Sequence, residues 1–206
     1  MNFAAFMRGA GLSAAIALAS ALPARAAEVD ATVVAGHPPV FLWVKLLTEV
    51  LIPETDKALE GTGDSIKWTE AYGGTLAKVG GEIEAMDADL AQIGVISSLF
   101  SPTLLPLQNV TYVTPFGSPE VDVAFGTVDR LHDELPEMRE GWEKLDLEYL
   151  SGGFGLEDYL LMTKFPVKSI ADLKGRKIGA PGPAVNWLKN TGAVGVSGNL
   201  TTYYND

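Results

Sequence analysis

Residues 29–39 read VDATVVAGHPP, and this short stretch carries the pattern that decides the fold. Its first seven residues are rich in valine and alternate in polarity, which is typical of a β-strand. Glycine ends the strand, and the two prolines suit the opening of a helix. From Val40 onward the apolar residues recur at the three-and-four spacing of a helix that packs by one face, and Pro53 should kink or restart it.

The alternation of strand and helix continues along the rest of the chain. The patterns predict further strands at residues 65–72, 90–96, 145–150, 159–163 and 177–180, and further helices at 75–86, 121–138 and 184–190. The run at 90–96 is short and continuously apolar, as in a buried parallel strand. Such alternation predicts an α/β fold with a largely parallel sheet. The glycine-rich residues 151–155 form the best internal boundary.

The first 26 residues have the features of a secretory signal peptide. One positive charge at Arg8 precedes an apolar run over residues 10–22, and Ala24-Arg25-Ala26 supplies a cleavage site with small residues. The run is shorter than the roughly 20 apolar residues that a membrane span needs. We therefore expect export to the periplasm, with a retained N-terminal anchor as the alternative.

Charge and composition restrict the classes of partner and chemistry. Removal of Arg8 and Arg25 leaves 13 of the 15 basic residues against 26 acidic ones, so the net charge changes from −11 to −13. Such a surface repels phosphate backbones, so we expect no nucleic-acid partner. The chain has no cysteine, which excludes a disulfide framework and a thiol nucleophile.

Motifs for catalysis, metal binding and cofactor binding are missing from the sequence. There is no Gly-x-Ser-x-Gly elbow and no Gly-Lys-Ser/Thr phosphate loop, and the only two histidines, His37 and His132, are 95 positions apart. His132 reads as a solvated helix residue, so a zinc site would need unusual help from carboxylates. We expect no catalytic residues, no metal and no cofactor, and hence no enzyme.

Three strands end in a small or glycine-rich turn that opens the next helix, at residues 36–39, 72–75 and 181–183. Ligands of open α/β sheets bind at the carboxyl ends of the strands. At the third turn the amides of Ala184 and Val185 could face a carboxylate, or the helix could be an ordinary capped one with water on its amides. Aromatic side chains near these turns suit the wall of a site for a small ligand.

Residues 165–178, FPVKSIADLKGRKI, resemble a motif of the DctP-type solute receptors of tripartite ATP-independent periplasmic (TRAP) transporters. In these receptors a proline-lysine-serine turn leads through DLKG to a K-I strand. The resemblance implies a two-lobed periplasmic-binding-protein-like fold of the second type. It also implies a receptor that closes on a small organic acid and delivers it to the TRAP membrane permease subunits. Members of the family extend well beyond Asp206, so we expect a C-terminally truncated chain with an incomplete second lobe.

These expectations define a signal peptide at residues 1–26, a first α/β lobe at 27–150, and a hinge with the start of a second lobe at 151–206. The family normally grips the ligand carboxylate with an arginine directly after the K-I strand, and Gly179 occupies that position here. Another cation or the helix-start amides would have to replace it, or the ligand differs, for example as an aromatic or less polar acid. The predicted ligand-binding residues are His37, Tyr72, Gly73, Phe154, Gly179, Trp187 and Tyr203.

Two other classes of function remain open at this point. A secreted α/β hydrolase or isomerase could carry a catalytic set that no motif marks. A sensory ligand-binding module could use the same fold as a transport receptor.

Overall fold

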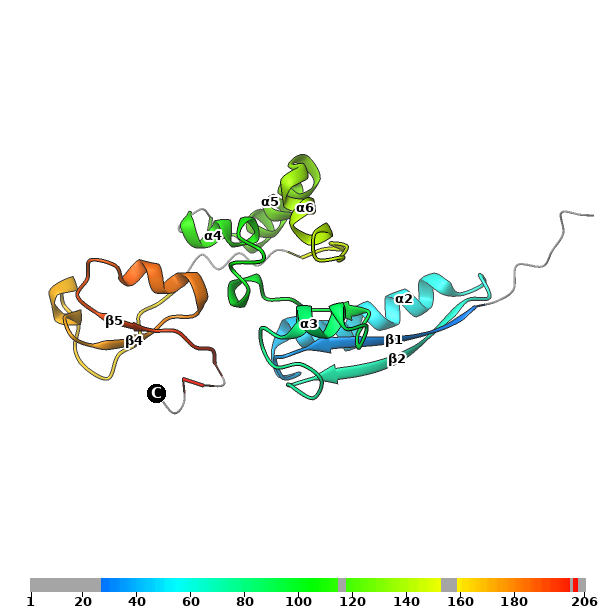
Figure 1. Cartoon of the computed structure of the whole chain (residues 1–206), viewed down its shortest axis with the longest axis horizontal. Coiled ribbons are helices and arrows are strands. Elements are labelled where there is room, and N and C mark those ends of the chain that lie inside the picture. Colours follow the sequence, from blue (N-terminus) through cyan, green and yellow to red (C-terminus); the bar gives the residue numbers. More distant parts are fainter. Residues whose placement is uncertain (1–26, 115–117, 153–158, 201, 204–206) are drawn as a thin grey trace, which may run out of the picture.

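The computed structural model describes residues 27–114, 118–152, 159–200 and 202–203 (Figure 1). Its larger sheet consists of β1 (Glu28–Ala35), β2 (Ser65–Tyr72) and β3 (Ile93–Gly94), in the order β2-β1-β3 and all parallel. β1 and β2 pair along their whole length, from Glu28 opposite Ser65 to Ala35 opposite Tyr72. Val33 and Val34 on β1 are both fully buried, as expected for a central strand covered on both faces. The strands predicted at 29–35 and 65–72 are confirmed.

One long helical segment covers the larger sheet, and it is divided into three parts. It begins with α1 (Leu42–Leu46), passes through a π-helical turn (Leu47–Leu51) and continues as α2 (Ile52–Leu59). The N–H of Ile52 donates to the carbonyl of Leu47, five residues back, directly before Pro53. Proline cannot give the usual bond to the residue four positions earlier. The wider turn therefore accommodates Pro53, and the restart predicted there is confirmed.

The packed face of this segment is narrower than the sequence pattern predicted. Val44 and Leu47 enter a core with Val33, Ala35 and Tyr72. Val40 is 83% exposed and Val50 47% exposed, so their placement on the buried face was wrong. Val40 precedes the helix, and within the π turn it is Leu51, not Val50, that packs against the core.

The helix predicted at residues 75–86 is mostly irregular, and only α3 (Glu82–Asp87) forms. Gly80 has φ +88°, a conformation that a right-handed helix cannot include. Glycine also loses the most chain entropy in a helix, so the Gly80-Gly81 pair delays its start. The strand expected at 90–96 is likewise reduced to β3, with Ile93 opposite Val33.

The buried carboxylate of Glu82 ties α3 to the end of β1. Its Oε1 accepts the N–H of Gly36 at 3.0 Å, and its Oε2 accepts the N–H of Gly80 at 2.7 Å. Glu82 is 2% exposed, and burial raises the pKa of its carboxyl group although the two backbone N–H groups act in the opposite direction. Gly36 lies so close to Val79 and Glu82 that a Cβ at this position would collide with both.

Short helices follow the larger sheet. They are the 3₁₀ turns Ser98–Phe100 (η2) and Leu107–Asn109 (η3), then α4 (Val110–Val113), α5 (Val121–Glu134) and α6 (Pro136–Glu143). The single helix predicted at 121–138 is wrong, because Leu135 is extended (φ −112°, ψ 104°) before Pro136. The residue before a proline is biased away from the helical conformation.

The turn at Leu135 folds α6 back on α5 and buries His132. Trp142 Nε1 donates to His132 Nε2 at 3.1 Å, and His132 Nδ1 lies 2.9 Å from the carbonyl of Val128. A carbonyl can only accept and an indole N–H can only donate, so Nδ1 donates to Val128 and Nε2 accepts from Trp142. The ring also stacks on Tyr149, with 3.7 Å between centroids. The expectation of a solvated His132 is therefore wrong.

The second sheet is small; within the described residues it pairs β4 (Lys177–Gly179) with β5 (Val194–Val196), and the two strands are parallel. The predicted capping box is present at the start of η4 (Ile170–Leu173), and the helix predicted at 184–190 is a 3₁₀ helix, η5 (Gly182–Leu188). Residues 145–150 and 159–163 are irregular, so the two strands expected there are wrong.

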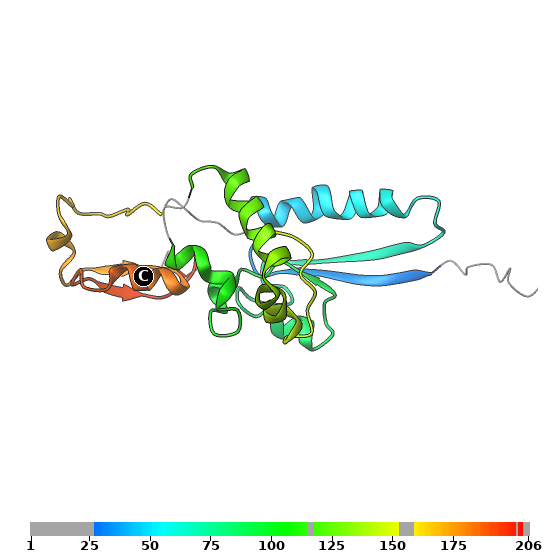
Figure 2. The same cartoon turned by 90° about the horizontal axis from the view of Figure 1, so that it is seen from above.

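The two sheets lie at opposite ends of the molecule, with α4, α5 and α6 between them (Figures 1 and 2). Residues 1–26, the predicted signal peptide, lie outside the described part of the chain. Within the described ranges, no helix combines the length and the apolar character needed to traverse a bilayer.

Replacement of Glu82 by Gln should lower the free energy of unfolding by about 1–3 kcal/mol. The amide can accept only one of the two backbone N–H groups, and its NH₂ would face the other. Glu84→Gln is the matched control, because Glu84 lies exposed on the same helix. Urea unfolding of both variants measures the difference, and equal stabilities would contradict the described role of Glu82.

The stability contributed by Glu82 should also depend on pH. Because burial raises the pKa of this carboxyl above its ordinary value of 4.5, the folded protein takes up the proton at a higher pH than the unfolded chain does. That contribution is fully present below the unfolded pKa and is lost as the pH rises through the folded one. Wild type should therefore gain stability relative to Glu82→Gln as the pH falls through this window, measured by urea unfolding at several pH values. If the stability difference between wild type and Glu82→Gln instead grows as the pH rises, the predicted pH dependence is contradicted.

Candidate ligand-binding site

The carboxyl ends of both sheets point toward the middle of the molecule. In Figure 1, β1 and β2 run inward from one side, and β4 and β5 run inward from the other. The chain leaves the strands there at Gly36, Gly73, Ala180 and Ser197. Ligands of open α/β sheets bind beyond such strand ends. The candidate site therefore comprises the residues that follow these four strands.

Three of the predicted site residues meet at the end of the larger sheet. The N–H of Gly73 donates to the carbonyl of His37 at 3.0 Å, which joins the turn after β2 to the turn after β1. Gly73 has φ +68°, a conformation that favours glycine. His37 is buried against the rings of Phe41, Trp43 and Phe100, and this burial lowers the pKa of its imidazole. A neutral imidazole follows, so His37 does not supply a cation at neutral pH.

Tyr72 belongs to the core of the larger sheet more than to its surface. Its side chain is 9% exposed and packs with Val33, Val44 and Leu47. The hydroxyl lies beside Thr48 and Glu70, and burial raises the pKa of the phenol. Tyr72 thus supports the Gly73 turn from within the core and offers little surface to a ligand.

At the end of the second sheet, the ring of Tyr203 lies over two glycines. A Cβ at Gly179 would come within 3.0 Å of Tyr203 Cε1, and a Cβ at Gly198 within 2.7 Å of the same atom. The N–H of Tyr203 donates to the carbonyl of Asn199, which bends the chain back toward the strands. The space next to Gly179 is therefore filled by an aromatic ring from within the chain.

Trp187 belongs to an aromatic cluster with Tyr112 and Tyr159. Its Nε1 donates to the carbonyl of Tyr112 at 2.8 Å, and the two tyrosine hydroxyls are 3.0 Å apart. Trp187 stacks on Tyr112 and meets Tyr159 edge to face, with centroid distances of 5.9 and 5.0 Å. Tyr112 was not among the predicted site residues. It comes from the irregular proline-rich stretch, where no periodicity indicates which side chains turn inward.

A backbone contact places this cluster against the segment that follows the larger sheet. Gly182, at the start of η5, has φ +47°, and a Cβ there would collide with the carbonyl oxygen of Leu99. Leu99 and Tyr112 share a buried cluster with Ala180 and Ala184. The amide of Ala184 is bonded to the carbonyl of Pro181, so it is not free for a carboxylate as considered from the sequence. Phe154 and most of the expected hinge at 151–155 lie outside the described residues.

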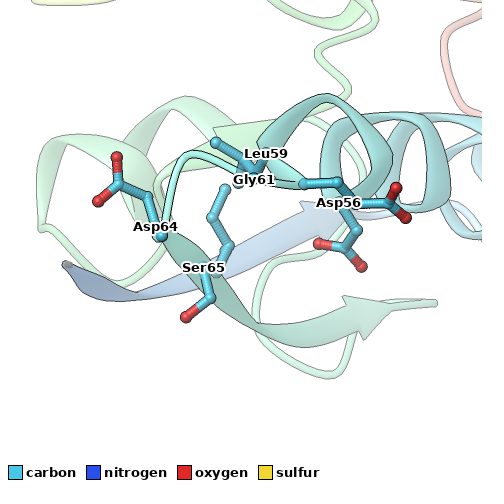
Figure 3. A pocket seen from close by; sticks show the side chains of 8 residues that line it. Asp56, Leu59, Gly61, Asp64 and Ser65 are labelled. Carbon is cyan, nitrogen blue, oxygen red and sulfur yellow. The ribbon is translucent and has the colours of Figure 1, made fainter.

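A separate pocket of about 400 Å³ lies at the opposite end of the larger sheet, between α2 and the start of β2 (Figure 3). Its lining includes the carboxylates of Asp56, Glu60 and Asp64. Asp56 accepts the indole N–H of Trp68 at 2.8 Å, and Asp64 accepts the N–H of Ala27 at 2.9 Å. These carboxylates repel an acid. Across the described ranges, no group of three or more histidine, aspartate or glutamate side chains could hold a metal ion.

Comparison with known proteins identifies the class of fold. No family model and no curated protein sequence matches the chain significantly. Solved structures do match, and they show that the chain has a periplasmic-binding-protein-like fold. Within that class, the matching structures include TRAP periplasmic solute-binding proteins, so the resemblance seen in the sequence is confirmed at the level of the fold.

Three of these structures illustrate the likeness. One is DctP6 of Bordetella pertussis, an extracytoplasmic solute receptor binding pyroglutamic acid (20% identity, TM-score 0.63, 82% of this chain and 53% of that one). Another is a marine metagenome TRAP solute binding protein specific for aromatic acid ligands, in complex with 3-hydroxybenzoate (16% identity, TM-score 0.64, 86% of this chain and 53% of that one). The third is a TRAP periplasmic solute binding protein from Roseobacter denitrificans with bound 3-deoxy-D-manno-oct-2-ulosonic acid (19% identity, TM-score 0.63, 86% of this chain and 57% of that one). The chain spans about half the length of the structures it matches.

Replacement of Gly182 by Ala should destabilise the protein by about 2 kcal/mol or more, because alanine disfavours a positive φ and its Cβ meets Leu99. Gly126→Ala is the matched control. Gly126 lies inside α5 with nothing within 4 Å of its Cβ position. Alanine there should raise the free energy of unfolding by about 0.5–1 kcal/mol. Thermal unfolding of both variants measures the effect. A Gly182→Ala protein as stable as wild type would contradict the described contact.

Proposed function

We propose that this protein is an extracytoplasmic solute-binding receptor that takes up a small organic acid and delivers it to the membrane permease subunits of a TRAP transporter. The observation that carries the proposal is the arrangement of two parallel sheets whose carboxyl ends face the same region, in a fold shared with TRAP solute-binding proteins. The ligands bound in the three structures described above, pyroglutamic acid, 3-hydroxybenzoate and 3-deoxy-D-manno-oct-2-ulosonic acid, are acids. A carboxylate is therefore the common feature of the class.

The proposal assigns a role to each part of the chain. Residues 1–26 direct export to the periplasm and are removed. Residues 27–150 form the first lobe, and residues from 151 onward form the hinge and the beginning of the second lobe. His37, Tyr72, Gly73, Phe154, Gly179, Trp187 and Tyr203 line or support the ligand site between the lobes. The receptor binds its ligand without converting it.

Support for the site comes from the turns themselves. The Gly73 to His37 bond holds the two turns of the larger sheet together, and the Gly182 approach to Leu99 holds the start of η5 against the segment after β3. Preorganised turns lower the entropic cost of binding a small ligand. These contacts are made by the backbone, so they present fixed geometry regardless of side-chain rotamers.

Organic acids should stabilise the purified protein against heat. A ligand at 100 times its dissociation constant adds about 2.7 kcal/mol to the free energy of unfolding. A thermal-shift screen of monocarboxylic, dicarboxylic, sugar and aromatic acids measures this, with the corresponding primary amides as neutral controls. Acids should raise the melting temperature and the amides should not.

Chemical analysis of the recovered ligand separates the competing functions. A receptor returns the acid unchanged after prolonged incubation, whereas a hydrolase or isomerase converts it. Absence of a thermal shift with every acid in the screen would refute the receptor proposal. A bound acid that does not stimulate uptake by the cognate permease in proteoliposomes would favour the sensory alternative.

A further inference from the structure

We propose that the ligand is an organic acid with an aromatic body, and that Tyr159 and Trp187 form the surface on which its ring lies. This inference rests on the proposed function and names the substrate class of the same site. It is carried by the aromatic cluster of Tyr112, Tyr159 and Trp187, which lies beside the carboxyl end of β4.

The cluster is rigid, because each ring is fixed by a neighbour. Trp187 donates its indole N–H to the carbonyl of Tyr112 at 2.8 Å, and it stacks on the Tyr112 ring at an angle of 27°. Tyr112 is 4% exposed, so it forms the buried base of the cluster. An aromatic surface whose orientation is already set loses little conformational entropy when a ligand binds.

Part of the cluster remains open to solvent. Tyr159 is 38% exposed, and Trp187 is partly exposed. Their rings meet edge to face at 74°. Aromatic pairs prefer such offset or edge-to-face arrangements, so a flat ligand ring can add a further favourable ring pair to this surface.

The hydroxyl pair supplies a donor for the acid group. Either hydroxyl can donate within the pair; when the buried Tyr112 donates to Tyr159, the more exposed Tyr159 hydroxyl can donate outward to a carboxylate. Burial raises the pKa of both phenols, with a larger effect at Tyr112. Both hydroxyls stay neutral at physiological pH and do not repel a carboxylate.

The neighbouring end of β4 adds apolar surface. Gly179 has no side chain, and the Tyr203 ring fills the adjacent space. The next residue, Ala180, shares a buried cluster with Tyr112 and Ala184. Both alanines are buried, so the strand end gives the aromatic cluster an apolar support without a charged group.

Titrations with 3-hydroxybenzoate, succinate and D-glucuronate test the inference by isothermal calorimetry and tryptophan fluorescence. We expect 3-hydroxybenzoate to bind at least tenfold more tightly than the other two acids. Trp187→Phe should weaken its binding about two- to tenfold and remove the ligand-dependent change in fluorescence. Trp68→Phe is the matched control, because Trp68 bonds to Asp56 at the other end of the larger sheet and should keep both properties.

Tyr159 provides a second, less buried position. Tyr159→Phe removes only the outward hydroxyl, and Tyr159→Leu removes the ring, so the first should weaken 3-hydroxybenzoate binding and the second should also abolish its preference over succinate. These variants decide the question if Trp187→Phe fails to fold, as judged by circular dichroism.

The outcomes separate this inference from the proposed function. Tighter binding of succinate or D-glucuronate than of 3-hydroxybenzoate, or unchanged binding in the Trp187 and Tyr159 variants, would overturn the aromatic assignment and leave the receptor proposal standing. Failure of every acid in the broader thermal screen would overturn both.

Discussion

The arrangement of the larger sheet depends on two backbone N–H groups that converge on one buried carboxylate. Glu82 accepts from Gly36, at the end of β1, and from Gly80, directly before α3. A buried charge is costly unless hydrogen bonds compensate for it, and here each oxygen has one. This interaction explains why α3 begins only at Glu82 and why the turn after β1 passes so close to Val79. The turns that bear His37 and Gly73 take their positions from that anchor.

The strands and the outline of the fold could be predicted from the sequence because they follow local patterns. β1 and β2 alternate in polarity and end in glycine, and both were placed within a residue of their observed bounds. The prediction of a helix at 75–86 was wrong over residues 75–81, because the Gly80-Gly81 pair opposes a helix more strongly than the apolar spacing favours one. The helix predicted at 121–138 is divided at Leu135, because a following proline disfavours the helical conformation and apolar spacing does not reflect this local rule. The short strands at 145–150 and 159–163 had the composition of strands but no partner among the described residues.

The candidate site was only partly predictable, since its geometry depends on contacts between distant segments. The position of Gly73 after β2 indicated its place at the site, and the likeness to TRAP receptors indicated the same for Gly179, which has no side chain to grip a carboxylate. Nothing local indicated that Tyr203 would cover Gly179, or that Tyr112 would meet Trp187 from 75 positions away. The burial of His132 by Trp142, ten positions further on, depends in turn on how α6 folds back on α5. Such pairings are set by how the segments pack together, and a single sequence carries no direct record of them.

The π turn at Leu47–Leu51 sets the rotational phase of everything after it on the same helix. An α-helix advances about 100° per residue, so a turn that holds one extra residue offsets the following side chains by that angle. This offset brings Asp56 to the indole of Trp68 on β2. A deletion of one residue from the turn would restore the ordinary periodicity and keep Asp56 opposite Trp68, whereas a deletion within α2 ahead of Asp56 would rotate Asp56 by about 100°. The turn can therefore lose its extra residue without loss of the Asp56 contact, and α2 cannot lose one.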